Sequence, residues 1–298
     1  MSLLNLTNDG LPNVLAMLHA AVLRAGKPVS RDELLETVAP SSVVDDAGKM
    51  ARQTLNRWTE LGLFSQEGDA ITVNEPPAET RIAALELQRF TRRVACKRAL
   101  AEENNADFWA SESARAADLT RSLAWMMAQD VYRASFSDFE VQEAQQIADP
   151  ERLLMRNSTR RNGLQYWAPF LGFSRHPHAA IDPTVAVRDV LPEILSAGQG
   201  MPAANFVARL ACLLPVLDGG CYQQEILAAV VPNALAPRNP GQLSTALSRA
   251  LMCLRASGDI VMASRSDTGS AITLTGAQGA RHDLIFQWIS RPAAGQIR

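Results

Sequence analysis

The sequence predicts a mostly α-helical protein in which two winged helix-turn-helix domains flank a helical middle domain. A helix-forming stretch followed by a short β-hairpin occurs twice, at 45–74 and at 239–275. Between these copies the chain is rich in Ala, Arg, Glu and Gln, which favour helix. We therefore expect three domains, at residues 1–75, 76–198 and 199–298.

The stretch 45–74 carries the clearest secondary-structure pattern. Apolar residues recur there at steps of three and four, which marks one face of an α-helix. They are Ala47, Met50, Ala51, Leu55, Trp58 and Leu61. Asp45 and Asp46 can cap this helix, and Gly62 can end it. Two apolar segments around a polar tip at 66–69 then predict a hairpin.

Two shorter helices are predicted upstream of this helix and hairpin. The first begins near Pro12, whose fixed φ suits the first turn of a helix, and it ends at Gly26. Ser30 and Glu33 have the spacing of a capping box for a second helix that ends near Val38. Three helices followed by a hairpin occur in DNA-reading modules and in protein-docking modules, so the fold alone does not choose a function.

The pattern of the first domain recurs near the C-terminal end of the sequence. Gly10-Leu11-Pro12 is matched by Gly200-Met201-Pro202, 190 positions later (200 − 10), and a helix is expected after each. A further helix is expected to end at Gly258, and the segment 260–275 is expected to be the second hairpin. A final packing helix is predicted over 280–290.

The middle domain is predicted to consist of helices joined by short connections. The predicted helices cover about 79–102, 107–131, 137–147, 149–156 and 182–196. The aromatic segment 163–173 is interpreted as a buried helix turn and loop.

Composition and charge limit the classes of function. The formal net charge is −2, with 29 basic and 31 acidic residues, so any contact with nucleic acid must be local. Four scattered cysteines without a C-x-x-C pair indicate reduced thiols. The sequence shows no secretory signal and no apolar run long enough to cross a bilayer. We therefore expect a cytoplasmic protein with no membrane partner.

The polar face of the helix within 45–74 is the first candidate DNA-binding site. Arginine reads guanine, and Asn or Gln reads adenine, because each can form two hydrogen bonds to one base edge. The candidate residues are Lys49, Arg52, Gln53, Asn56 and Arg57. An ordinary solvated helix face would have similar residues. Glu67 and Asp69 at the hairpin tip also count against DNA, because they would repel phosphates.

The second copy offers a weaker candidate surface. Its helix is expected to expose Gln242, Thr245, Ser248 and Arg249, and Arg265 lies at the tip of its expected hairpin. Thr245, Arg249 and Arg265 are the proposed DNA-binding residues there. Because this helix carries few charges, protein docking is an equally good interpretation.

The most basic segment of the chain is 81–98. Arg89, Arg92, Arg93 and Lys97 recur there at steps of three and four, so they share one stripe of the predicted helix 79–102. We expect this stripe to extend a DNA-binding surface. The alternative is that these cations pair with acids elsewhere, such as Glu102 and Glu103.

No sequence pattern points to catalysis. The phosphate loop G-x-x-x-x-G-K-[ST], the nucleophile elbow G-x-S-x-G and the zinc motif H-E-x-x-H are all absent from the sequence. His176-Pro177-His178 has no Cys or carboxylate at ligand spacing, so a surface loop is favoured over a metal site. We expect a protein that is not an enzyme and that needs no cofactor or metal.

Two segments resemble a known family. LLNLTNDGLPNVLAML at 3–18 and ARQTLNRWTELGLF at 51–64 resemble DpdG, an accessory protein of bacterial gene clusters that insert 7-deazaguanine derivatives into DNA and restrict foreign DNA. The resemblance covers about the first 75 residues. It implies a role beside modification and restriction enzymes in anti-phage defence, and it supplies no catalytic residue.

Together these patterns predict a non-catalytic double winged-helix protein. Its expected partners are double-stranded DNA and other proteins of a defence or DNA-modification and restriction assembly, and a homo-oligomer is left open. The alternative is an adaptor whose winged helices dock proteins, as in kleisin-like subunits of chromosome-organising complexes. A transcription regulator is the third interpretation.

Overall fold

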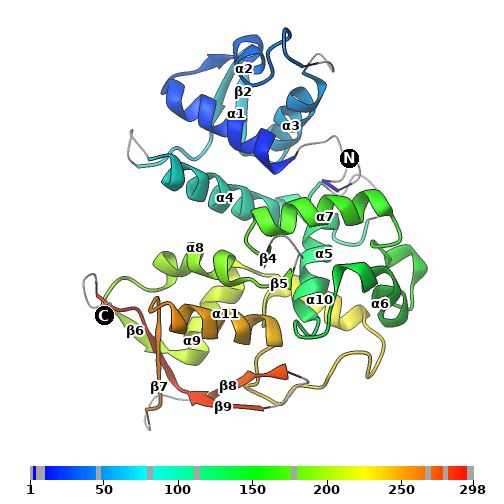
Figure 1. Ribbon diagram of the computed structural model, residues 1–298, viewed down its shortest axis with the longest axis vertical. Coiled ribbons are helices and arrows are strands. Elements are labelled where there is room, and N and C mark those ends of the chain that lie inside the picture. Colours follow the sequence, from blue (N-terminus) through cyan, green and yellow to red (C-terminus); the bar gives the residue numbers. More distant parts are fainter. Residues whose placement is uncertain are drawn as a thin grey trace. The chain divides into compact units, whose positions relative to one another are not determined.

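The computed structural model describes residues 3–4, 11–44, 48–78, 83–110, 115–175, 180–265, 270–277 and 281–293 (Figure 1). Within these residues the protein is mostly helical, as predicted, with eleven α-helices and four small sheets. Two compact units can be distinguished. Unit 1 comprises Met1–Leu119 and Asn157–Leu171, and unit 2 comprises Thr120–Arg156 and Gly172–Arg298. No helix of the described residues is long and apolar enough to cross a membrane.

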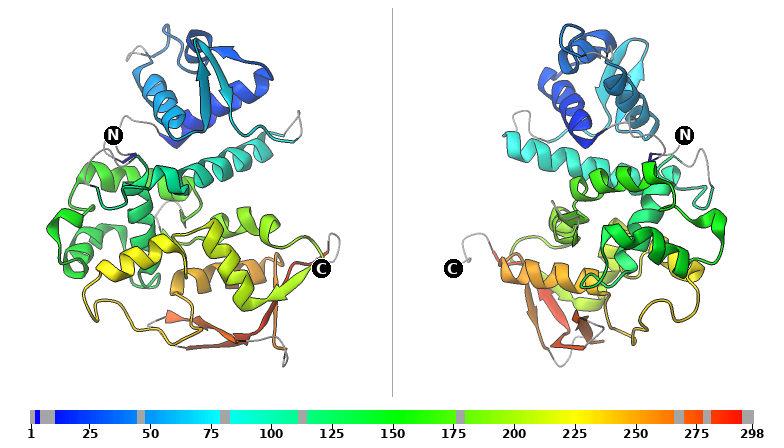
Figure 2. Two further views of the ribbon diagram at one scale, coloured as in Figure 1. Left: turned by 180° about the vertical axis from the view of Figure 1, so that it is seen from behind. Right: turned by 45° about the vertical axis from the view of Figure 1, so that its right-hand side comes forward.

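Unit 1 begins with three helices and a three-stranded antiparallel sheet. The elements are α1 (Pro12–Ala25), β1 (Val29–Ser30), α2 (Arg31–Val38), α3 (Lys49–Glu60), β2 (Phe64–Glu67) and β3 (Ala70–Val73). The strand order is β1-β3-β2, and both views of Figure 2 show the β2–β3 hairpin beside the helices. The predicted helix and hairpin within 45–74 are therefore confirmed. The expected caps Asp45 and Asp46 lie outside the described residues.

Apolar residues at helical spacing place the core of this part of unit 1 between α1, α3 and the sheet. Leu15 and Leu18 of α1 and Leu55 and Trp58 of α3 are fully buried. Gly62 follows α3 with a φ of +80°, a conformation that favours glycine, so the predicted end of this helix is confirmed. The predicted capping box is wrong. Ser30 occupies the N-cap position of α2, but its side chain forms no capping hydrogen bond.

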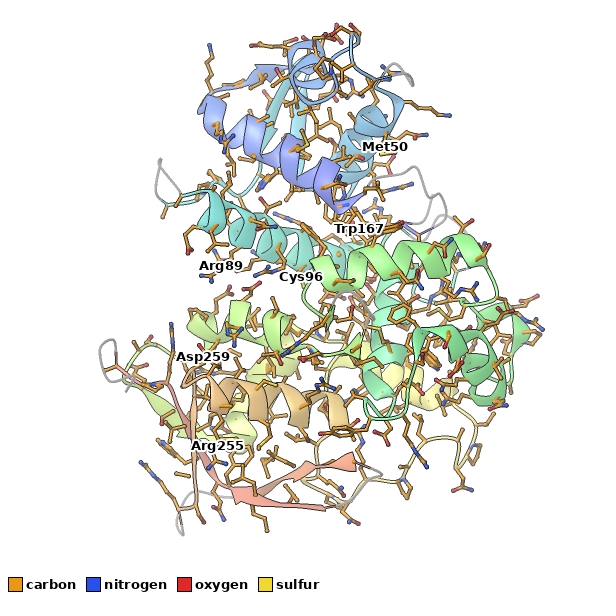
Figure 3. All side chains as sticks on the ribbon, viewed as in Figure 1. Met50, Arg89, Cys96, Trp167, Arg255 and Asp259 are labelled. Atoms are coloured by element: carbon orange, nitrogen blue, oxygen red, sulfur yellow. The ribbon has the colours of Figure 1, made fainter. Side chains whose placement is uncertain are left out.

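Two longer helices complete unit 1. The helix α4 (Ala84–Leu100) packs against α1 and leads into the short 3₁₀ helix η1 (Glu102–Asn104). The helix α7 (Ser158–Phe170) is capped by Asn157, whose side chain accepts hydrogen bonds from two backbone N–H groups. The segment 163–173, interpreted as a helix turn and loop, is helical up to Phe170, and the helix is longer than expected because this cap starts it further upstream. Trp167 of α7, labelled in Figure 3, packs against Trp58 of α3. The two ring centres are 5.3 Å apart.

Unit 2 contains most of α5 and a longer series of elements. They are α5 (Ala117–Ala128), η2 (Phe136–Asp138), α6 (Phe139–Gln146), η3 (Pro150–Arg152), β4 (Ser174–Arg175), β5 (Ala180–Ile181), α8 (Thr184–Ile194), β6 (Gly200–Pro202), α9 (Ala203–Leu213), α10 (Cys221–Ala229), α11 (Thr245–Ala256), β7 (Val261–Ala263), β8 (Ile272–Thr275), β9 (Arg281–Phe286) and β10 (Trp288–Ser290). The helix predicted over 149–156 was wrong, because only one 3₁₀ turn forms there.

The order of elements in unit 1 recurs in unit 2. The series α8, β6, α9, α11, β7 and β10 corresponds to α1, β1, α2, α3, β2 and β3, and the sheet order β6-β10-β7 matches β1-β3-β2. Pro12 and Thr184 begin the first helices, 172 positions apart (184 − 12). Lys49 and Thr245 begin the third helices, 196 positions apart (245 − 49). The inserted residues hold α10, and the hairpin β8–β9 is a second insertion.

This correspondence corrects the predicted register of the repeat. Gly200-Met201-Pro202 forms β6 and corresponds to β1, whereas the sequence pattern matched it to the start of the first helix. Glycine is needed at position 200 for another reason. A Cβ atom there would lie 2.5 Å from the indole nitrogen of Trp288 on the neighbouring strand. The match to Gly10 was therefore a coincidence of two short motifs, and Gly10 lies outside the described residues.

The second predicted hairpin and the final helix were also wrong. The expected hairpin would pair β7 with β8. Instead, β7 pairs with β10, and β8 pairs with β9, so the hairpin β8–β9 is inserted between the two paired strands β7 and β10. The segment 281–290, predicted as a helix, forms the strands β9 and β10. Aromatic and β-branched residues such as Phe286 and Ile289 favour strands, and both are buried.

Candidate nucleic-acid interface

The exposed face of α3 brings three of the predicted DNA-binding residues together. Lys49, Arg52 and Asn56 are exposed at steps of three and four residues, so they follow one side of the helix. Gln53 is half-buried beside them. A row of two cations and one carboxamide can contact phosphates and base edges at the same time.

Arg57 does not belong to this face. Its side chain is only 5% exposed and forms an ion pair with Glu60 at 3.0 Å. The expected exposure of Arg57 was therefore wrong. Position 57 lies at the boundary between the polar and apolar faces of α3, where the folded chain covers the guanidinium group. It supports the helix rather than a ligand.

Arg31 is a residue of this surface that the sequence patterns did not reveal. Its guanidinium group donates to Asn56 Oδ1 at 2.5 Å and to Gln66 Oε1 at 3.0 Å, so it links α2, α3 and the hairpin. This contact orients the carboxamide of Asn56. The oxygen of that carboxamide has a second lone pair and the nitrogen has two hydrogens, so two hydrogen bonds to an adenine edge remain available to it.

Carboxylates border the α3 face. Glu67 and Asp69 are exposed at the tip of the β2–β3 hairpin, and Asp32 and Glu33 are exposed in the first turn of α2. Glu60 is exposed at the C-terminal end of α3. Because carboxylates repel phosphates, the cations Lys49 and Arg52 are the part of this surface that suits a phosphate, and the hairpin tip does not.

The basic stripe lies on α4, as the spacing predicts. Arg89 and Lys97 are exposed, and Arg92 and Arg93 are half-buried; Figure 3 labels Arg89 on this helix. The two exposed cations form ion pairs, Arg89 with Glu86 at 3.2 Å and Lys97 with Glu75 at 2.9 Å. The alternative that the cations of this stripe pair with acids is thus observed for Arg89 and Lys97.

Glu75 is the acid that the sequence patterns did not identify. It contacts Lys97 and also Arg98, the latter at 2.5 Å. Partial burial acts to raise the pKa of Glu75. The hydrogen bond from Lys97 and the charges of Arg98 and Lys97 outweigh this effect and lower the pKa below its ordinary value. Exposed ion pairs of this kind contribute only about 0–1 kcal/mol, so a phosphate can compete with Glu75 for Lys97.

The helix α11 corresponds to α3, yet its matching positions are buried. Thr245 donates to the carbonyl of Gln129 and accepts from the N–H of Val131, both at 3.1 Å. Ser248 is 2% exposed and accepts from the N–H of Thr275 at 2.8 Å. The expected exposure of Thr245 and Ser248 was therefore wrong, because their hydroxyl groups bind backbone groups within unit 2.

The two arginines predicted in unit 2 differ in their surroundings. Arg249 is 31% exposed and lies 3.4 Å from the buried carboxylate of Asp182. Arg265 is exposed at the end of β7, and its guanidinium carbon lies 4.2 Å from the ring centre of Trp288. Only Arg265 is thus presented at the surface in the way the sequence pattern suggested.

The histidines and the possible metal ligands were the remaining candidates for a site. Groups of three or more His, Cys, Asp or Glu side chains that could hold a metal are absent from the described part of the chain. His176 and His178 lie outside the described residues. The buried His19 receives or donates a hydrogen bond at 2.8 Å with Thr91, and burial lowers the pKa of His19 to about 4. At neutral pH His19 is therefore an uncharged core residue.

Comparison with known proteins identifies the family. A search of curated proteins and a search of solved structures found no match to this chain. The DpdG-like family matches residues 1–268, so the match covers unit 1 and most of unit 2 and extends far beyond the 75 residues that carried the resemblance. Membership in this family suggests a role in a DNA-modification cluster. This chain belongs to the DpdG-like family.

Proposed function

We propose that this protein is a non-catalytic, double winged-helix protein that binds duplex DNA within a DNA-modification and defence assembly. Three helices and a three-stranded sheet with the first strand beside the third support a winged helix in unit 1. The same order in α8, β6, α9, α11, β7 and β10 supports a second winged helix in unit 2. The family supports the DNA-modification setting.

The observation that carries the proposal is the exposed row of Lys49, Arg52 and Asn56 on α3. In a winged helix this third helix enters the major groove, and its exposed face reaches base edges. Arg31 supports the row by holding the carboxamide of Asn56. The stripe on α4 adds contacts with the DNA backbone, because Arg89 and Lys97 are paired only with surface carboxylates.

The proposal is tested by titrating a labelled duplex with the full-length protein over a series of salt concentrations. With about four to six phosphate contacts, the slope of log K against log salt is expected to be roughly −4 to −5. The double variant Arg52→Ala, Asn56→Ala should weaken binding to a preferred sequence more than binding to a random duplex. Arg24→Ala on α1, which removes an exposed cation elsewhere in unit 1, is the matched control.

The absence of catalysis is part of the proposal. The sequence has no phosphate loop, and the described residues hold no cluster of metal ligands. Pure protein should therefore show no nuclease, ATPase or methyltransferase activity. Robust turnover that one point substitution in this chain abolishes would contradict this part.

Protein docking is the second candidate function, and the carboxylates around α3 favour it. Glu67, Asp69, Asp32 and Glu33 form an acidic border that suits a basic partner protein better than DNA. If no duplex binds even at low salt, the adaptor becomes the better proposal. Binding with the expected salt slope favours DNA.

A further inference from the structure

The exposed edge of the sheet β6-β10-β7 carries a cation stacked on an aromatic ring. We define the second wing as Val261–Arg265 together with Trp288–Ser290. We propose that this wing grips the phosphate backbone of duplex DNA through Arg265, with Trp288 as its support. This inference rests on the proposed DNA binding and adds a contact that is separate from the α3 face of unit 1.

The stack gives Arg265 a defined position at the surface. Its guanidinium carbon lies 4.2 Å from the centre of the Trp288 ring, a short distance for a cation–π contact. Arg265 is exposed and Trp288 is half-buried. A guanidinium group placed over a ring keeps its planar set of N–H donors, which can bind phosphate oxygens in pairs.

Neighbouring residues hold both members of the stack. Gln287 Oε1 accepts from the hydroxyl of Ser264 at 3.0 Å and from the N–H of Arg265 at 3.2 Å, so the end of β7 is tied to the strand that carries Trp288. Gly200 on β6 leaves room for the indole, because a Cβ there would lie 2.5 Å from its nitrogen. The pair is therefore pre-organised, which reduces the entropy lost when a ligand binds.

The helix of unit 2 cannot supply the contact that α3 supplies in unit 1. Thr245 and Ser248, which correspond to Lys49 and Arg52, are buried and bonded to backbone groups. A winged helix whose third helix is covered can still contact DNA through its wing. The wing of unit 1 ends in Glu67 and Asp69, whereas the second wing presents Arg265, so their expected roles are opposite.

The geometry favours a backbone phosphate over an unstacked base as the ligand. Arg265 covers one face of the Trp288 ring, and β6 at Gly200 approaches the indole closely. A base would have to displace the arginine before it could stack on the ring. A phosphate needs only the edge of the guanidinium group, so duplex DNA should bind without opening.

The experiment measures binding of the full-length protein to a labelled 20-base-pair duplex over a salt series. The variants are Arg265→Ala, Arg265→Lys and Trp288→Phe. Arg255→Ala is the control, because Arg255 is an exposed cation on α11 outside the wing (Figure 3). Tryptophan fluorescence during the titration gives a second readout. Thermal unfolding of each variant shows that the fold is retained.

We expect Arg265→Ala to weaken duplex binding about three- to tenfold at low salt and to reduce the salt slope by about one. Arg265→Lys should keep the slope but bind more weakly, because an ammonium group cannot form the paired contact. DNA should also quench part of the tryptophan fluorescence of the parent, and this quenching should be smaller in Trp288→Phe. Arg255→Ala should bind like the parent.

Other outcomes separate this inference from the proposed function. If the parent protein binds DNA and Arg265→Ala binds equally well, the wing contact is wrong while the α3 proposal stands. If Arg265→Ala loses affinity and the Arg52→Ala, Asn56→Ala variant does not, the wing contact stands and the role of α3 fails. If the parent binds no duplex, or binds single strands much more tightly, the wing contact is wrong.

Discussion

The third helices of the two units share their position in the order of elements, but the outer face of α3 is exposed and that of α11 is mostly buried. On α3, positions 49, 52 and 56 hold exposed Lys, Arg and Asn. On α11, the matching positions hold Thr245 and Ser248, both buried, and Met252, which is half-buried. The apolar faces agree, since Leu55 and Trp58 match the equally buried Leu251 and Leu254. Only the outer faces have diverged.

This difference shows how additions to a fold can change what a repeated element does. The α11 face is covered by the carbonyl of Gln129 and the N–H of Val131, which follow α5, and by Thr275 on the inserted hairpin β8–β9. On α3, Lys49, Arg52 and Asn56 stay exposed, although Arg31 of α2 donates a hydrogen bond to Asn56. The repeated order of elements therefore determines where this helix lies, and the neighbouring segments decide whether its outer face is exposed.

The largest expected effect comes from exchanging the residues at one matched position. Ser248→Arg introduces the residue of α3 into α11, where the site is 2% exposed and Thr275 needs the hydroxyl as an acceptor. Burying a cation and removing this hydrogen bond should cost about 3 kcal/mol or more. For a unit of this size the melting temperature should fall by roughly 6 °C or more. Thermal unfolding followed by circular dichroism measures the change.

The reverse exchange, Arg52→Ser, is the matched control. Because Arg52 is exposed, its replacement should alter the free energy of unfolding by no more than about 0.5 kcal/mol while weakening DNA binding. Equal losses of stability in both exchanges would mean that the two helices do not differ in their surroundings.

Acidification should change the contributions of His19 in unit 1 and Glu143 in unit 2 in opposite directions. Burial lowers the pKa of His19 to about 4, from 6.5 for a free histidine. Below pH 6.5 the unfolded chain therefore binds a proton at His19 that folded unit 1 does not bind. The free energy of unfolding should fall by about 3 kcal/mol as the pH falls to 4. Position 191 of α8, which matches His19, is a leucine, so unit 2 has no pH dependence from a histidine at this position.

In unit 2, Glu143 provides the opposite dependence. Burial raises the pKa of Glu143, against the hydrogen bonds from Leu154 and Met155 and the charges of Arg121 and Arg156. A raised carboxyl pKa contributes stability that is present below the unfolded value of 4.5 and is lost as the pH rises through the folded value.

Hydrogen exchange at pH 7 and pH 5, corrected for intrinsic rates, can separate the units. Protection should fall in α1 and not in α6. His19→Leu should abolish the change in α1, because leucine has no group that binds a proton. The hydroxyl of Thr91 is still satisfied in this variant, since it donates to the carbonyl of Leu87. An unchanged pH response in that variant would remove His19 as the cause.

Periodicity predicted the elements whose buried face is determined by local sequence. The helix α3 was predicted because its apolar residues recur at helical steps, whereas α4 was predicted from a segment rich in Ala, Arg, Glu and Gln and α8 from the start signal Asp182-Pro183. Long-range pairing could not be derived in this way. Strand β7 pairs with β10, which begins 27 positions later (288 − 261), and nothing local to either segment specifies that partner.

The candidate site was predictable only in part for the same reason. Lys49, Arg52 and Asn56 could be placed on one face from spacing alone. The burial of Arg57 depends on residues that are distant in sequence. The role of Arg31 depends on the pairing of β1 with β3, which brings the start of α2 beside the hairpin. Ion pairing of Lys97 with Glu75 likewise crosses 22 positions (97 − 75).

The stripe on α4 tests whether unit 1 binds DNA over more than one helix. Arg92→Glu combined with Arg93→Glu should weaken duplex binding about tenfold or more and reduce the salt slope by about two, with folding intact. If both side chains instead serve the interior of unit 1, the melting temperature should fall by many degrees. A variant that binds DNA like the parent across the salt series would remove α4 from the interface.

The smallest expected effect is a gain of affinity, and it concerns Glu75. This carboxylate holds Lys97 and Arg98, so it competes with phosphate for two cations beside the stripe. Glu75→Gln keeps the shape of the side chain and removes the charge. Duplex binding at low salt should therefore strengthen about two- to threefold, because each cation becomes more available. Stability should fall by no more than about 1 kcal/mol, since the pairs are partly exposed. The matched control is Glu86→Gln, which frees only Arg89 and should give a smaller gain. Weaker binding in Glu75→Gln would contradict this expectation. It would show that the carboxylate positions Lys97 and Arg98 for DNA rather than competing with phosphate for them.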